Sequence, residues 1–209
     1  PVHAIFFGGG TPSLFPPAAI DRFLQGASAR LRLMPGLEVT LETNPGTAEH
    51  GRFADYLAAG VNRLSFGIQS FDDGCLQRLG RIHDSAQAEA AVKQARDAGF
   101  DNFNLDLMYA LPGQDLAMAE RDVARAIALD PAHISHYQLT LEPNTLFAAR
   151  PPSGIPGDDL AWDMQEHCQA LLADGGYAQY EISAYARPGR QCAHNLNYWR
   201  YGDYLGIGA

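Results

Sequence analysis

Short apolar segments with the length of buried strands alternate with helix-like segments along the first 141 residues of the chain. The predicted strands are Ala4–Phe7, Glu38–Glu42, Arg63–Phe66, Phe103–Met108 and Ile134–Leu139. The predicted helices are Pro17–Leu31, Thr47–Ala58, Asp72–Leu79, Ser85–Ala98 and Asp115–Leu129. A repeat of roughly thirty residues is typical of βαβ units, which place parallel strands in one sheet through right-handed crossovers. The alternation predicts an α/β fold, either a doubly wound sheet or part of a (β/α) barrel.

The character of the sequence changes after residue 141. The segment Glu142–Asp158 is rich in proline and is predicted to be a loop, and Asp158–Ala173 has the spacing of an amphipathic helix. Two tyrosine-rich segments, Tyr177–Tyr185 and Asn195–Leu205, favour strands and turns over helix. This second part is predicted to be an α+β extension of the first.

The sequence is therefore divided into an α/β domain at residues 1–141 and a C-terminal extension at residues 142–209. A buried strand begins almost at the first residue, and the last residues, Gly206 to Ala209, follow no element boundary. We expect the chain to be a piece of a longer protein, with the extension incomplete at its end.

Composition excludes several classes of protein. The chain has 209 residues with a net charge of −9, which disfavours a nucleic-acid or anionic-membrane surface. No apolar run approaches the roughly 20 residues that a membrane-spanning helix needs. Three widely separated cysteines, Cys75, Cys168 and Cys192, form no zinc or disulfide framework. An odd number of cysteines is typical of a reducing compartment, so we expect a cytoplasmic protein.

Polar residues follow the predicted strands, where the carboxyl ends of parallel strands form ligand sites. The first strand ends in Gly8, Gly9, Gly10 and Thr11. A glycine tract lets a ligand approach the backbone closely, although a tight turn explains it equally well. Glutamate, glutamine and aspartate follow or lie in the next three strands, at positions 42, 69 and 106.

Each of these side chains also has an ordinary structural explanation. Glu42 is consistent with a solvated strand end, and Gln69 with a residue that ties down its loop. Asp106 lies among apolar neighbours, and a carboxylate there needs a partner or a ligand. An ion pair with Arg81 would satisfy it as well as a ligand would.

Metal and hydrolase motifs are weak or absent in this sequence. His133 and His136 are three residues apart on a predicted strand, so they point to opposite faces and do not share a metal. Cys192 and His194 are spaced for chelation, but two ligands do not complete a metal site. The sequence has no Gly-x-Ser-x-Gly elbow, no Walker A loop and no GxGxxG fingerprint.

Longer motifs recur in a fixed order along the whole chain. They are Phe7–Ser13 (FGGGTPS), Glu42–Gly46 (ETNPG), Arg63–Phe71 (RLSFGIQSF), Leu79–His83 (LGRIH), Asn104–Gly113 (NLDLMYALPG), Tyr137–Thr145 (YQLTLEPNT) and His194–Trp199 (HNLNYW). Together they resemble the radical S-adenosylmethionine (SAM) proteins related to oxygen-independent coproporphyrinogen III oxidase. Within that group they are most similar to the HemW-like branch of haem chaperones.

The resemblance implies a partial (β/α)₆ barrel of parallel strands, of which residues 1–141 would supply strands two to six. It also implies a [4Fe–4S] cluster and S-adenosylmethionine as cofactors. By the same resemblance, the cofactor-binding residues for S-adenosylmethionine are Gly8, Gly9, Gly10, Thr11, Glu42, Gln69, Arg81 and Asp106. An arginine suits the ligand carboxylate, and Glu42 suits ribose hydroxyls or an ammonium group.

One departure from the family pattern is large. The CxxxCxxC motif that holds the family's cluster is absent, and Cys75, Cys168 and Cys192 do not replace it. We therefore expect the cluster only in the full-length parent, no metal site in this chain, and no radical chemistry from this chain alone.

The segment His194–Trp199 is similar to the HNxxYW motif of the chaperone branch. The resemblance gives His194, Tyr198 and Trp199 as haem-binding residues, since an imidazole can ligate iron and aromatic rings can stack on a porphyrin. Packing of the extension against the barrel explains the same residues equally well.

Three functions follow from these observations. We expect a haem chaperone with haem or porphyrin and a haem-receiving protein as partners. The alternatives are a true coproporphyrinogen III oxidase, which the HNxxYW-like segment disfavours, and a non-redox barrel enzyme. Lys93, the only lysine, lies on a predicted helix, which disfavours Schiff-base chemistry at the strand ends.

Overall fold

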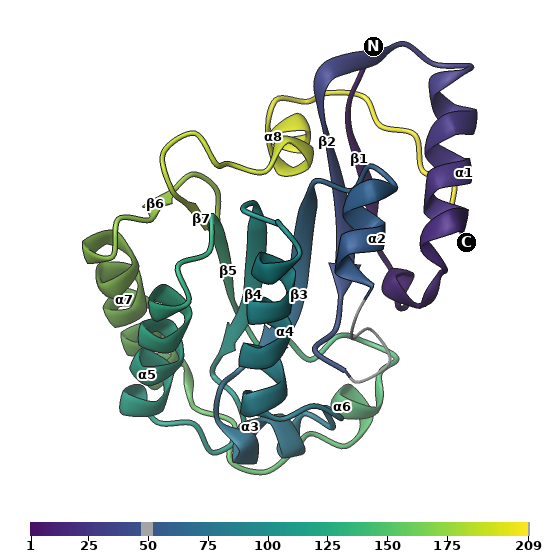
Figure 1. The fold of residues 1–209 in the computed structure, drawn as a ribbon. Helices are drawn as coiled ribbons and strands as arrows, with labels where there is room; N and C mark the ends of the chain where they lie inside the picture. Colours follow the sequence, from purple (N-terminus) through teal and green to yellow (C-terminus); the bar gives the residue numbers. More distant parts are fainter. Residues whose placement is uncertain (47–51, 209) are drawn as a thin grey trace.

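The computed structural model describes residues 1–46 and 52–208. In this part of the chain a seven-stranded sheet has the strand order β1-β2-β3-β4-β5-β7-β6 (Figure 1). The strands are β1 (Val2–Phe7), β2 (Leu33–Thr43), β3 (Arg63–Gln69), β4 (Phe103–Tyr109), β5 (His133–Gln138), β6 (Ala178–Gln179) and β7 (Ala184–Ala186). The first five strands are parallel and adjacent in chain order, whereas β7 pairs antiparallel with β5 and β6 pairs antiparallel with β7. The predicted parallel α/β sheet with a mixed C-terminal part is confirmed.

Helices connect the strands and cover one face of the sheet. They are η1 (Pro12–Leu14), α1 (Pro17–Ser28), α2 (Phe53–Ala58), α3 (Asp73–Arg78), α4 (Ser85–Asp97), α5 (Leu116–Ala128), α6 (Leu146–Ala149), α7 (Asp158–Asp174) and α8 (Ala193–Trp199). Figure 1 shows α2, α4 and α5 lying along the same face, and α4 contacts β3 while α5 contacts β4. The helix α7 packs on α5 and so extends this layer over β7.

The covered face of the sheet is apolar. Successive side chains of a strand point to opposite faces, so every second residue faces the helices. Leu64 and Phe66 of β3 and Leu105 of β4 are fully buried on this face. The ring of Phe66 packs edge-on against Phe53 and Phe103, with centroid separations of 5.8 and 6.2 Å. Burial of these side chains forms the core that holds the strands in register.

The opposite face of the same strands is polar. The strand register places Thr40 beside Arg63, Glu42 beside Ser65, and Asp106 beside Ser135. The polar residues of this face, two apart on each strand, are Glu38, Thr40 and Glu42 on β2, Arg63 and Ser65 on β3, Asn104 and Asp106 on β4, and His133, Ser135 and Tyr137 on β5. A sheet with one apolar and one polar face can line a ligand site with the polar one.

Carboxylate caps start the helices that follow β3 and β4. Asp72 accepts a hydrogen bond from the Cys75 N–H at 2.9 Å, and Asp115 accepts one from the Met118 N–H at 2.8 Å. Each cap satisfies an N–H that has no partner within its helix. The caps therefore fix where the loops at the strand ends stop and the helices begin.

Most predicted boundaries differ from the structure by one to three residues, and three segments differ by more. The strand β2 begins at Leu33, five residues before the predicted start, because its first part pairs with Val2 of β1. The predicted loop at 142–158 contains the short helix α6, which Thr145 caps through its hydroxyl. The predicted helix at 47–58 is observed from Phe53, and the expected Thr47 cap lies outside the described residues.

The prediction of strands and turns over Asn195–Leu205 is wrong in its first half, where helix α8 forms. The carboxylate of Glu38 accepts hydrogen bonds from the N–H groups of Ala193 and His194, at 3.0 and 3.1 Å. These contacts cap the helix from a strand more than 150 residues away. Tertiary capping therefore outweighs the strand preference of the aromatic residues.

The division of the chain at residue 141 stays a prediction. The strand β5 from the first part and the strand β7 from the second part belong to the same sheet. No helix within residues 1–46 and 52–208 is long and apolar enough to cross a membrane.

Candidate functional site

The carboxyl ends of β1 to β5 bring the predicted S-adenosylmethionine residues together at one edge of the sheet. In Figure 1 this is the edge beside α3 and α6. The glycine tract follows β1, Glu42 ends the polar row of β2, and Gln69 ends β3. Asp106 lies on β4, next to β3 in the sheet.

The glycine tract lies against Glu42. The N–H of Gly9 donates a hydrogen bond to the Glu42 Oε2 at 2.9 Å. Gly9 and Gly10 have φ of +80° and +58°, and a Cβ at either position would meet no atom within 4 Å. Both residues are exposed, and Thr11 next to them is half-buried at the start of η1. The tract therefore has exposed backbone in a conformation that glycine adopts readily.

Arg81 is held beside the end of β3 by two neutral acceptors. Its Nη2 donates to the Asn44 Oδ1 at 2.9 Å and to the Gly67 carbonyl oxygen at 3.0 Å. A Cβ on Gly67 would lie 3.1 Å from the Asn44 Oδ1 and from the Gln69 Nε2, and 3.2 Å from the Arg81 Nη2. The absence of a side chain at Gly67 thus leaves room for these three polar groups to meet.

Gln69 has a left-handed backbone, with φ of +69°, at an irregularity in the pairing of β3 with β4. Its Oε1 accepts a hydrogen bond from the Tyr137 hydroxyl on β5 at 3.1 Å. A non-glycine residue in this region is strained and persists only where its surroundings hold it. The pairing with Tyr137 fixes the side chain over the polar face.

Asp106 is satisfied by neutral donors rather than by Arg81. Its carboxylate accepts hydrogen bonds from the Asn104 Nδ2 at 2.7 Å and from the Ser65 Oγ at 3.2 Å. Arg81 appears in none of the ion pairs found among the described residues. The ion pair considered from the sequence is therefore not formed, and within residues 1–46 and 52–208 the Arg81 guanidinium makes no direct contact with a carboxylate.

The electrostatics couple these groups. Burial raises the pKa of Asp106, which the hydrogen bond from Asn104 lowers in part. Burial also raises the pKa of Glu42, and the charge of Asp106 adds to that increase. Burial lowers the pKa of Arg81, whereas Tyr137 and Asp106 raise it. Two carboxyl groups and one guanidinium therefore share one partly buried place, which suits a ligand that carries both an ammonium and a carboxylate group.

The predicted haem residues lie on α8, which packs against β1 (Figure 1). The imidazole of His194 stacks on Phe6 with a centroid separation of 4.5 Å, and the ring of Tyr198 packs edge-on against His194 at 5.0 Å. Burial lowers the pKa of His194, which keeps the imidazole neutral at pH 7. The rings of Tyr198 and Trp199 are 46% and 51% exposed, so half of each aromatic surface faces solvent.

The cysteines do not form a cluster site. All three are free and buried, on α3, on α7 and at the start of α8. Burial raises the pKa of Cys75 to about 11, of Cys168 to about 12 and of Cys192 to about 11, so each is a thiol at neutral pH. No group of three His, Cys, Asp or Glu residues that could hold a metal is present in the described part of the chain. These residues do not fit a [4Fe–4S] cluster.

His133 and His136 point to opposite faces of β5, as predicted. His133 bonds to the Asn104 Oδ1 at 2.6 Å on the polar face and to the Tyr180 hydroxyl at 2.7 Å. His136 stacks on Tyr109 with a centroid separation of 4.7 Å. Both imidazoles are buried and serve the structure of the sheet.

Sequence reasoning missed several residues of the site. Glu38, Arg63 and Ser65 line the polar face, and Glu38 also caps α8. Their signal in the sequence is a polar residue at every second position of β2 and β3, a spacing that marks the face away from the helices.

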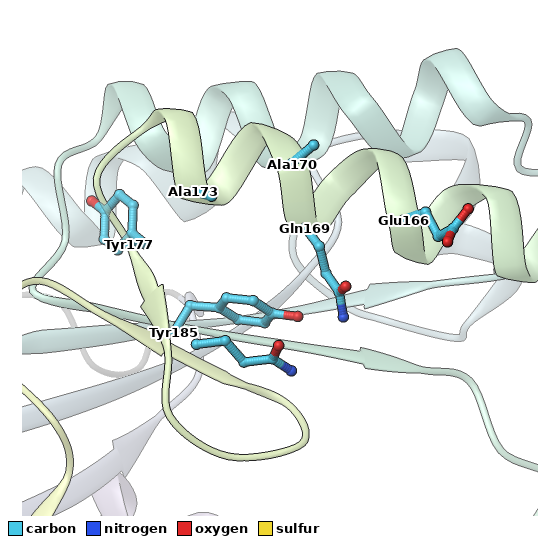
Figure 2. Close-up of a pocket in the computed structure, with 7 residues that line it drawn as sticks. Glu166, Gln169, Ala170, Ala173, Tyr177 and Tyr185 are labelled. Carbon is cyan, nitrogen blue, oxygen red and sulfur yellow. The ribbon is translucent and has the colours of Figure 1, made fainter.

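A separate cavity lies between α7 and the last two strands (Figure 2). Its volume is about 370 Å³. The lining residues are Glu166, Gln169, Ala170, Ala173, Tyr177, Gln179 and Tyr185. None of the predicted site residues lines this cavity, which lies on the helix-covered side of the sheet.

Comparison with known proteins identifies relatives of the chain. The family model of the radical SAM superfamily matches residues 1–126. The chain is 56% identical over 207 residues to the heme chaperone HemW of Escherichia coli and 55% identical over 207 residues to that of Haemophilus influenzae. Each alignment covers 99% of this chain and 54% of the relative, so the chain spans about half the length of these proteins.

A solved structure shares the fold. The coproporphyrinogen III oxidase HemN of Escherichia coli, a radical SAM enzyme, superimposes with a TM-score of 0.81 and 26% sequence identity. The alignment covers 95% of this chain and 46% of that enzyme. The predicted partial barrel of radical-SAM type is therefore confirmed as a curled, mostly parallel half-barrel.

Proposed function

Since the chain belongs to the radical SAM superfamily, we propose that the carboxyl ends of its strands bind S-adenosylmethionine. The observation that carries this proposal is the convergence of Glu42, Gln69, Arg81 and Asp106 from three strands and one loop at one edge of the sheet. A ligand with a charged amino-acid end and a ribose matches this mixture of two carboxyl groups, one guanidinium and amide groups.

Each residue has a role set by its chemistry. The exposed backbone of the glycine tract lies against the methionine end, and the Glu42 carboxylate, which already accepts from the Gly9 N–H, accepts from the ammonium group or from ribose hydroxyls. Arg81 donates to the ligand carboxylate. Asp106 and Gln69 supply acceptors for the remaining hydroxyl and amino donors. When bound with a cluster, S-adenosylmethionine supplies the radical chemistry of the superfamily; the described residues hold the ligand and contribute no cluster.

We further propose that the full-length protein is a haem chaperone. The 56% identity to a heme chaperone over almost the whole chain supports this function more strongly than the 26% identity to the oxidase HemN. The neutral imidazole of His194, with the half-exposed ring of Tyr198 packed edge-on against it, has the chemistry to ligate haem iron, and the half-exposed rings of Tyr198 and Trp199 can stack on a porphyrin. Haem would then be cargo, passed to a receiving protein.

The cellular setting is part of this proposal. Three free, buried thiols are typical of a reducing compartment, and we place the protein in the cytoplasm. The net charge of −9 disfavours nucleic acid as a partner.

Isothermal titration of the chain with S-adenosylmethionine tests the first proposal. Replacement of Arg81 by methionine, which keeps the length and removes the charge, should weaken binding by about tenfold to a hundredfold, because a charged hydrogen bond is lost. Arg150, an exposed arginine beyond α6, gives a matched control as Arg150→Met. Binding that is absent in the wild type, or equal in both variants, would overturn the proposal.

Titration with haemin tests the chaperone proposal. We expect a shifted Soret band in the wild type and its loss in His194→Ala, with His167→Ala on the exposed face of α7 as the control. A Soret shift that survives in His194→Ala would exclude this imidazole as the ligand. Formation of protoporphyrinogen by the full-length protein in an anaerobic assay would favour the oxidase instead.

A further inference from the structure

One buried carboxylate outside the proposed ligand residues joins the loops that carry them. Asp122 lies on α5 and is only 3% exposed. Its Oδ2 accepts a hydrogen bond from the Ser70 Oγ at 2.7 Å, and its Oδ1 accepts one from the Phe71 N–H at 2.7 Å. Ser70 and Phe71 directly follow Gln69, so the carboxylate is hydrogen-bonded to the loop that begins at the end of β3.

The same carboxylate reaches the loop after β4. The Gln114 Nε2 donates to the Asp122 Oδ2 at 3.3 Å, while the Gln114 Oε1 accepts from the Leu111 N–H at 3.1 Å. Leu111 follows Ala110, whose φ is +57°. Gln69 and Ala110 are both non-glycine residues with a left-handed backbone. Asp122 holds the two residues that follow Gln69 directly, and it reaches the residue after Ala110 through Gln114.

Left-handed residues of this kind need outside support, because each costs on the order of 1–3 kcal/mol unless the surroundings fix it. Arg125, one turn after Asp122 on α5, adds to that support. Its Nη1 donates to the Phe71 carbonyl oxygen at 2.9 Å, and its guanidinium lies over the Phe71 ring at 5.1 Å. The helix thus holds both the N–H and the carbonyl of Phe71.

Burying a charged carboxylate to hold a loop costs free energy. Burial raises the pKa of Asp122 to about 6, so the group is charged at neutral pH against the preference of its surroundings. Groups retained at such a cost are common where a site must be held in place.

We propose that Asp122 is a positioning residue for S-adenosylmethionine, which it serves by fixing the backbone of Gln69 and thereby the Gln69–Tyr137 pair. This inference rests on the proposed function of the strand edge. Asp122 does not touch the ligand; it acts through the loop.

The test uses Asp122→Ala, Asp122→Asn and the control Glu120→Gln, which neutralises a partly exposed carboxylate on the same helix that pairs with His167 of α7. We expect Asp122→Ala to weaken S-adenosylmethionine binding by about tenfold to a hundredfold, because charged hydrogen bonds to the loop are lost. Asp122→Asn should recover part of the affinity, since its Oδ1 still accepts from the Phe71 N–H. Glu120→Gln should bind as the wild type does.

Amide hydrogen exchange adds a readout that needs no ligand. The Phe71 amide should exchange faster in Asp122→Ala, whereas amides in the centre of β4 keep their protection. If Asp122→Ala does not fold, Ser70→Ala replaces it, because that variant removes one contact and leaves the carboxylate in place.

The outcomes separate the two proposals. Wild-type affinity in a folded variant with a rapidly exchanging Phe71 amide would overturn the positioning role and leave the proposed function intact. Failure of the wild type itself to bind S-adenosylmethionine would overturn the proposed function and, with it, this inference.

Discussion

Replacement of Asp106 by asparagine should stabilise the ligand-free protein and weaken its affinity for S-adenosylmethionine. Burial raises the pKa of the Asp106 carboxyl group above its unfolded value. The protonated form of such a group stabilises the folded state. This contribution is complete below the pKa of the unfolded state and is lost as the pH rises through the pKa of the folded state. A negative charge on this carboxyl group therefore opposes folding.

The structure sets the expected size of both effects. In the wild type, the Asp106 carboxylate lies 2.7 Å from the Asn104 Nδ2 and 3.2 Å from the Ser65 Oγ. An asparagine at this position can still accept from the Asn104 Nδ2 and can donate to the Ser65 Oγ. A single stabilising substitution commonly adds about 0.5–2 kcal/mol to the free energy of unfolding, and each kcal/mol raises Tm by roughly 2–4 °C in a chain of this size. Loss of a charged acceptor costs about 1.5–3 kcal/mol of binding, or roughly tenfold to more than a hundredfold in Kd.

Thermal unfolding at pH 7 and pH 4.5 and isothermal titration measure these two quantities. The gain in Tm should shrink as the pH is lowered, because protonation removes the charge that opposes folding. Asp163→Asn, an exposed change on α7, serves as the control. A lower Tm of Asp106→Asn at pH 7 would refute the reasoning, because it would show that the charged carboxylate stabilises the fold.

Three further changes test the fold and the site. Burial lowers the pKa of His136 to about 4, so the stability that its neutral form contributes is complete above pH 6.5 and is lost as the pH falls toward 4. The free energy of unfolding, measured by urea titration, should therefore fall by up to about 3 kcal/mol between pH 7 and pH 4. The variant His136→Phe should show a smaller fall over this range. Phe66→Ala should cost about 3–5 kcal/mol in the same assay, because the ring is fully buried. Gly67→Ala should weaken S-adenosylmethionine binding by about tenfold in titration calorimetry, since its Cβ would crowd polar groups 3.1–3.2 Å away.

Two of these changes have a matched control in the chain. His167→Phe, which replaces an exposed histidine on α7, is the matched control for the loss of an imidazole. Gly157→Ala adds a Cβ that meets no atom within 4 Å and should leave binding unchanged. A Gly67→Ala protein that binds with wild-type affinity would show that the space above Gly67 is not part of the ligand site.

The sheet and most of the helices were predictable from the sequence. Local sequence patterns predict a strand at Arg63–Phe66 and a helix at Asp72–Leu79, and the structure has β3 and α3 at these places. Helix α8 was not predictable in this way, because its cap, Glu38, lies on a distant strand. Local propensity carries no information about such a contact.

The residues of the candidate site were predictable from the sequence, but the hydrogen bonds between them were not. Glu42, Gln69, Arg81 and Asp106 were selected because they follow strands or match family motifs. The neutral partners of Asp106, the Gln69–Tyr137 pair and the role of Asp122 depend on the register between strands and on the left-handed turns. These features come from tertiary packing, which a single sequence does not specify residue by residue.

The proposed function depends most on where S-adenosylmethionine contacts the protein. Amide chemical shifts of the ¹⁵N-labelled chain, recorded during titration with S-adenosylmethionine, measure this directly. We predict saturable shifts at Gly9, Gly10 and Gln69 and at the side chain of Arg81. Shifts that centre instead on Gln169 and Tyr185 of the cavity in Figure 2, or a spectrum that the ligand leaves unchanged, would contradict it.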